Sequence, residues 1–136
     1  MTDAPAASRT VVVECALPHP PEKVWRALTQ PALIAEWLMQ NDFAPVADHR
    51  FTLRADWGTV ECRVLEVVPQ RSLSYAWVAY GVKTVVTWTL TPVAEGTHLR
   101  MEQSGFRPDQ QQAFAGAQGG WPRFFAALEQ VLARMG

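Results

Sequence analysis

The hydrophobic and polar positions of this chain follow two periods, which change at about residue 110. Between residues 10 and 104 they largely alternate, as in Val86, Trp88 and Leu90 against Thr87 and Thr89. This alternation is typical of strands that bury one face. Further along, apolar residues recur every three or four positions, which predicts one long amphipathic helix. Such a helix must cover a sheet, and a sheet curved around it leaves a pocket between the two.

The expected strands and helices follow in a fixed order. We predict strands at 10–17, 43–47 (weak), 50–55, 59–68, 73–77, 83–91 and 97–104, and short helices at 21–28 and 32–38. Short turns between the later strands indicate an antiparallel meander. Within 59–68 the apolar set changes face, so we predict a β-bulge near Val64 and Leu65, after which Leu65 and Val67 point inward.

The last helix carries one polar residue, Gln118, on its apolar stripe. The other members of the stripe are Phe114, Trp121, Phe125, Leu128, Leu132 and Met135. Pro122 cannot donate a hydrogen bond to the carbonyl of Gln118, and Gly119 and Gly120 lower helix propensity just before it. We therefore expect a kink or break at 118–121, between arms at 108–118 and 121–135.

Composition narrows the class of protein. The length of 136 residues and the 49% hydrophobic content predict one globular domain, at 9–136, and the formal charge is −1. Residues 1–8 are polar and rich in alanine, and we expect them to form a tail. No basic stripe suggests nucleic acid, and we expect no signal peptide and no membrane insertion. Cys15 and Cys62 are then expected to be reduced, in a cytoplasmic protein. The spacing of Cys and His predicts no metal site, and no motif predicts a cofactor.

The candidate site is an aromatic cavity between sheet and helix. Six tryptophans give the chain large apolar surfaces with polar handles, and core packing is the alternative role for each. Gln103 and Gln118 could each fix a ligand carbonyl or hydroxyl, since an amide both donates and accepts, although Gln118 could instead satisfy backbone near Pro122. The expected cavity residues are Trp37, Tyr75, Trp77, Met101, Gln103, Gln118, Trp121 and Phe125. His19, His49 and His98 are expected at the surface.

Several short segments resemble one known family. They are Val24-Trp25-Arg26-Ala27-Leu28-Thr29, Pro31, Trp37, the region 64–77, Gly96-Thr97-His98-Leu99, Ser104-Gly105-Phe106 and Gly120-Trp121 with Leu128. Their order, over about residues 10–134, resembles bacterial proteins related to the activator of the Hsp90 ATPase, within the superfamily of START domains and polyketide cyclases. The resemblance implies an α+β helix-grip fold, with a curved antiparallel sheet wrapped around a long C-terminal helix.

The resemblance implies three functions, of which binding a small hydrophobic ligand, aromatic or acyl-type, is the first. In that case the chain is a non-catalytic carrier or sensor. The second is a protein-interaction module linked to stress response, although direct action on the chaperone is not expected of one domain. The third is a cyclase-like enzyme using Arg54, Tyr75 and Gln103. Related proteins often carry His near position 103, and Gln cannot replace His in acid–base work. The sequence assigns no catalytic residue and leaves a homodimer open.

Overall fold

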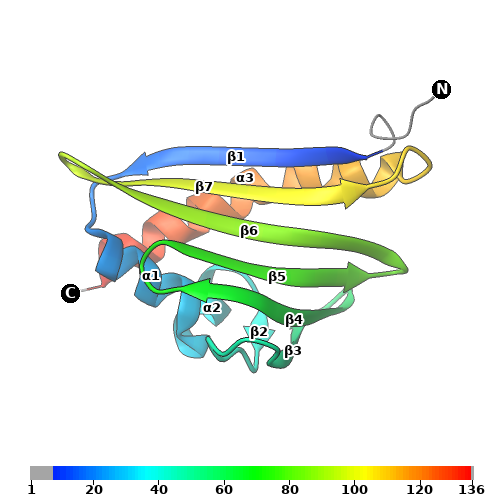
Figure 1. Ribbon diagram of the computed structural model, residues 1–136, viewed down its shortest axis with the longest axis horizontal. Helices are drawn as coiled ribbons and strands as arrows, with labels where there is room; N and C mark the ends of the chain where they lie inside the picture. Colours follow the sequence, from blue (N-terminus) through cyan, green and yellow to red (C-terminus); the bar gives the residue numbers. More distant parts are fainter. Residues whose placement is uncertain (1–7, 136) are drawn as a thin grey trace.

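The computed structural model describes residues 8–135, so the predicted tail at 1–8 lies almost wholly outside the described residues. One antiparallel sheet of seven strands runs in the order β1-β7-β6-β5-β4-β3-β2 and curves around α3 (Figure 1). The strands are β1 (Arg9–Leu17), β2 (Gln40–Asn41), β3 (Arg50–Ala55), β4 (Gly58–Val68), β5 (Ser72–Ala79), β6 (Val82–Val93) and β7 (Gly96–Phe106). The helices are α1 (Pro21–Thr29), α2 (Pro31–Trp37) and α3 (Gln111–Arg134). The predicted helix-grip fold is confirmed.

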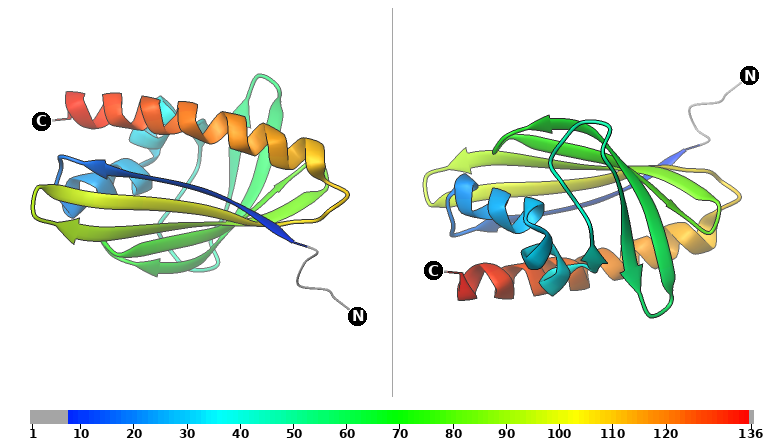
Figure 2. Two further views of the ribbon diagram at one scale, coloured as in Figure 1. Left: turned by 90° about the horizontal axis from the view of Figure 1, so that it is seen from above. Right: turned by 90° about the horizontal axis from the view of Figure 1, so that it is seen from below.

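The helix α3 lies along the concave face of the sheet (Figure 2). Its buried residues begin at its middle, and they are Trp121, Phe125, Leu128, Val131 and Leu132. The short helices α1 and α2 lie near the C-terminal end of α3 and contact it (Figure 2). The second half of α3 is therefore closed in by sheet and helices, whereas its first half faces the sheet without that cover.

Trp88 of β6 lies at the centre of the core. It is fully buried, and its ring centroid lies 5.6 Å from that of Trp37, 5.7 Å from Trp121 and 5.8 Å from Phe125. Its indole N–H donates to the hydroxyl of Tyr75 at 2.9 Å. One residue thus joins sheet, α2 and α3, and aromatic pairs at such distances contribute about 0.5–1.5 kcal/mol each beyond the area they bury.

The β-bulge in β4 is confirmed, since the register with β5 shifts between Val64 and Glu66. The prediction that Leu65 points inward is wrong: its side chain is 39% exposed. Leu65 is the extra residue of the bulge and is left unpaired, so Val67 regains its partner Leu73 while Leu65 turns outward.

The weak strand predicted at 43–47 is also wrong. The chain there forms a loop, and the short strand β2 comes earlier, at Gln40–Asn41. The side chain of Asn41 accepts from the backbone N–H of Phe43, which turns the chain away from the sheet. Phe43 is nevertheless buried, edge to face against Phe51 at 5.0 Å between centroids. Burial rather than strand pairing explains its apolar character.

Of the kink or break predicted at 118–121, the break is wrong, because α3 continues through Pro122 as a single helix. Pro122 lies on the exposed side of the helix, so solvent can satisfy the carbonyl of Gln118 that Pro122 leaves without a donor. Packing of the neighbouring Trp121 and Phe125 then outweighs the low local helix propensity. No helix within residues 8–135 is long and apolar enough to cross a membrane.

Pro122→Ala should raise the free energy of unfolding by about 1 kcal/mol or more, because alanine restores the helical hydrogen bond and has far higher helix propensity. Urea denaturation followed by circular dichroism measures this change. Gln130→Ala, at another exposed position of α3, is the matched control and should change stability by about 0.5 kcal/mol or less. A less stable Pro122→Ala variant would contradict the account of α3.

Candidate functional site

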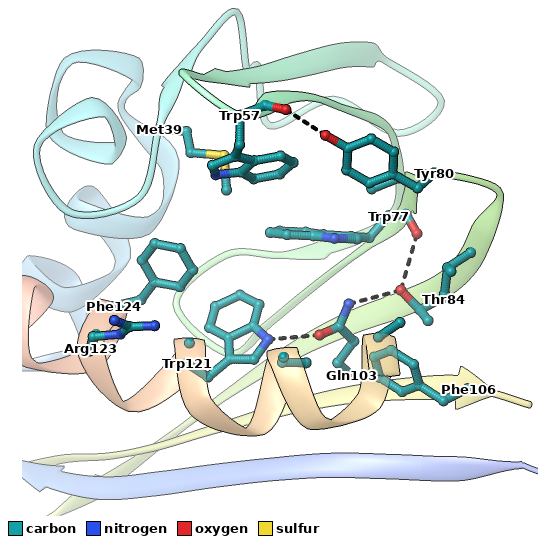
Figure 3. A pocket seen from close by; sticks show the side chains of 16 residues that line it. Met39, Trp57, Trp77, Tyr80, Thr84, Gln103, Phe106, Trp121, Arg123 and Phe124 are labelled. Atoms are coloured by element: carbon teal, nitrogen blue, oxygen red, sulfur yellow. Dashed lines mark hydrogen bonds between the residues drawn. The ribbon is translucent and has the colours of Figure 1, made fainter. Parts of the chain in front are cut away.

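A cavity of about 410 Å³ lies between the first half of α3 and the end of the sheet that holds the β5–β6 hairpin (Figure 3). The β3–β4 turn and the residues after α2 complete its wall. The lining residues are Met39, Trp57, Trp77, Ala79, Tyr80, Val82, Thr84, Gln103, Phe106, Ala113, Gly116, Ala117, Gly120, Trp121, Arg123 and Phe124.

Six of the residues that line the cavity are aromatic. Trp121 lies 5.4 Å from Trp77 and 5.4 Å from Phe124 between ring centroids. At the opposite side Trp57 and Tyr80 pair at 6.0 Å, and the Tyr80 hydroxyl donates to the carbonyl of Trp57. These two are 52% and 78% exposed, so they form the mouth, whereas Trp121 is buried at the base (Figure 3).

The space exists because one face of α3 carries small residues. Ala113, Gly116, Ala117 and Gly120 recur at spacings of three, one and three, which places them on one side of a helix. A Cβ atom built on Gly116 or Gly120 would meet no heavy atom within 4 Å. The helix therefore stands off the sheet here without its own side chains filling the gap.

A chain of hydrogen bonds crosses the base of the cavity. The indole N–H of Trp121 donates to Oε1 of Gln103 at 2.7 Å, and Nε2 of Gln103 donates to the Thr84 hydroxyl at 2.9 Å. The Thr84 hydroxyl donates in turn to the carbonyl of Trp77 at 3.1 Å. An indole can only donate, so this chain fixes which end of the Gln103 amide is oxygen. Gln103 retains one N–H and one lone pair.

The comparisons with known proteins agree with this architecture. The family model described as activator of Hsp90 ATPase homolog 1-like protein matches residues 18–133. The chain belongs to this family. The predicted resemblance is therefore confirmed, and the family's fold is a ligand-binding fold.

Several solved structures superpose on almost the whole chain. Protein MLL2253 from Mesorhizobium loti is 59% identical, with a TM-score of 0.90 over 94% of this chain and 99% of its own. BH1534 from Bacillus halodurans is 25% identical, with a TM-score of 0.82 over 93% and 99%. DynU16, a protein of the dynemicin biosynthetic locus, is 26% identical over 92% of this chain and 47% of its own, with a TM-score of 0.82. No curated protein gives a significant match.

Three of the expected cavity residues, Trp77, Gln103 and Trp121, line the cavity of this Hsp90-activator-like chain. Four others, Trp37, Tyr75, Met101 and Phe125, are buried in the core and do not line it. Trp37 donates to the carbonyl of Ala27 at 2.8 Å, and Tyr75 accepts from Trp88. Gln118 is exposed, so its expected position on the buried stripe is wrong.

The residues suggested for a cyclase-like reaction do not come together. Arg54 is exposed on β3 and lies outside the cavity lining, Tyr75 is in the core, and Gln103 alone lines the cavity. Burial raises the pKa of the Tyr75 phenol above its ordinary value, so the group stays protonated at neutral pH. An acid–base role for this set has no support in the geometry.

Sequence reasoning missed Thr84, Arg123 and the small-residue face of α3. The sequence pattern indicates low helix propensity at Gly119 and Gly120, whereas in the structure Gly120 belongs to the cavity wall. The spacing of Ala113, Gly116, Ala117 and Gly120 would have been the available signal.

The cysteines and histidines lie outside the cavity lining. Both thiols are free, and burial raises the pKa of Cys15 to about 11 and that of Cys62 to about 12. His98 faces outward, 3.0 Å from the carboxylate of Glu14. Among residues 8–135, no three Cys, His, Asp or Glu side chains are grouped so as to hold a metal ion.

Gln103→Leu should lower the free energy of unfolding by about 1–3 kcal/mol, because the buried indole N–H of Trp121 loses its acceptor. Urea denaturation measures the loss, and the exposed Gln112→Leu on α3 serves as the control for the change of residue type. Equal stability of the two variants would show that the hydrogen-bond chain contributes nothing.

Proposed function

We propose that the protein binds a small aromatic or acyl-type molecule in the cavity at the first half of α3, and acts as a carrier or sensor. The observation that carries the proposal is the cavity itself. Its volume of about 410 Å³ falls within the roughly 300–1,000 Å³ typical of ligand sites, and its wall combines aromatic and small apolar residues with a few polar groups.

The wall favours a flat ligand with a polar group at one end. Trp77, Trp121 and Phe124 offer ring faces that suit an aromatic ring or a short acyl chain. Gln103 is held by Trp121 and Thr84, and its remaining N–H suits a carbonyl or hydroxyl oxygen of the ligand. Because that donor is already oriented, binding costs little side-chain entropy.

The character of the lining favours binding over catalysis. Its titratable side chains are Tyr80, at the mouth, and Arg123, and neither is suited to act as a general base at neutral pH. The origin of DynU16 in a biosynthetic locus agrees with a role in handling small molecules. Cytoplasmic location, a link to stress response and a homodimer stay predictions.

Gly120→Leu should weaken binding of 6-hydroxy-2-naphthamide, a neutral flat probe, by roughly tenfold or more, measured by isothermal titration calorimetry. The new side chain has room within the cavity and would occupy the space that the ligand needs. Leucine also raises helix propensity, so the variant should fold.

Gly119→Leu is the matched control. Gly119 is the neighbouring glycine of α3, is exposed and does not line the cavity, and a Cβ there also meets no heavy atom within 4 Å. This variant should bind the probe as the wild type does. Equal affinity of both variants, or no binding to the wild type, would refute the proposed function.

A further inference from the structure

The cavity has a polar group at each of two ends. Gln103 and Thr84 lie on one side of Trp121, and Arg123 lies on the other side, beside Phe124 (Figure 3). The aromatic surfaces of Trp77 and Trp121 occupy the space between. A ligand that fills the cavity therefore meets an amide at one end and a guanidinium at the other.

The helical repeat explains why Arg123 reaches the cavity. Gly120 comes four positions after Gly116, and Arg123 comes three positions after Gly120. Arg123 therefore lies on the same face of α3, one turn further along. Among the residues that line the cavity, Arg123 is the one with a charged side chain. Arg123 is exposed, so its guanidinium lies at the edge of the cavity, where a bound group can reach it.

The charge of Arg123 is not neutralised by the protein. Within residues 8–135 it forms no ion pair and no side-chain hydrogen bond, which is also true of several other surface arginines, but among the unpaired arginines it is the one that lines the cavity. The paired arginines are Arg26 with Glu22, Arg100 with Glu14 and Glu102, Arg107 with Asp109, and Arg134 with Glu36. A guanidinium of this kind suits a carboxylate, which it can bind through two parallel hydrogen bonds.

We infer that the ligand is an aromatic carboxylate. Its ring packs against the faces of Trp77 and Trp121 that line the cavity, a hydroxyl or carbonyl oxygen accepts from Gln103, and its carboxylate pairs with Arg123. The inference rests on the proposed function and adds the sign of the ligand's charge and its direction in the cavity.

The test compares 6-hydroxy-2-naphthoate with 6-hydroxy-2-naphthamide, two probes of nearly equal shape that differ in charge. Isothermal titration calorimetry at neutral pH and low salt gives the dissociation constant of each. The acid should bind the wild type roughly threefold or more tightly than the amide, the size expected for a partly exposed ion pair. This preference should shrink as salt is added.

Arg123→Gln should abolish the preference for the acid, because it weakens binding of the acid more than binding of the amide, while Arg123→Lys should retain part of the preference. Arg71→Gln is the matched control for net charge, since Arg71 is exposed in the β4–β5 turn and lies outside the cavity lining. It should keep the preference of the wild type. Thermal unfolding checks that the variants fold.

The outcomes separate the inference from the proposed function. Equal binding of acid and amide to the wild type, or a preference that survives Arg123→Gln, would overturn the inference and leave the proposed function standing. Loss of the preference in Arg71→Gln as strongly as in Arg123→Gln would also overturn it, because net charge alone would then be the cause. Failure of both probes to bind would refute the two together.

Discussion

The packing of α3 on the concave face of the sheet changes along the helix, and the rest of the structure depends on that change. In its second half, large side chains such as Phe125 and Leu128 fill the space to the sheet. In its first half, Gly116 and Gly120 leave that space empty. Protein interiors are otherwise close-packed. The small residues on this face of α3 therefore leave a cavity between the first half of the helix and the sheet.

Trp121 marks the boundary between the two halves and belongs to both. One side of its ring packs against Trp88 in the core, and its other contacts, with Trp77 and Phe124, form the cavity wall. Its indole N–H also sets the orientation of Gln103. The stability of the core is thereby coupled to the geometry of the binding groups, which gives the cavity a rigid, preorganised base.

The sequence predicted the fold well, since alternation and helical spacing report which face of an element is buried. They do not report whether a buried side chain lies in the core or at a cavity, so the sequence pattern alone does not separate Trp37 and Met101, which lie in the core, from Trp77, which lines the cavity. The cavity exists because the residues on one face of α3 are small, and a hydrophobicity pattern does not distinguish small from large apolar residues. Its face on α3 runs through Ala113, Ala117, Gly120 and Phe124, one position before the stripe that includes Gln118.

The central claim is that the ligand binds at the first half of α3, and the indole N–H signals of the tryptophans test it most directly by two-dimensional NMR. Titration with 6-hydroxy-2-naphthamide should shift the signals of Trp77 and Trp121, which line the cavity. The signal of Trp37, whose N–H is bonded to the Ala27 carbonyl in the core, should stay unchanged. Shifts confined to Trp37, or no shift at Trp77 and Trp121 on saturation, would contradict the account.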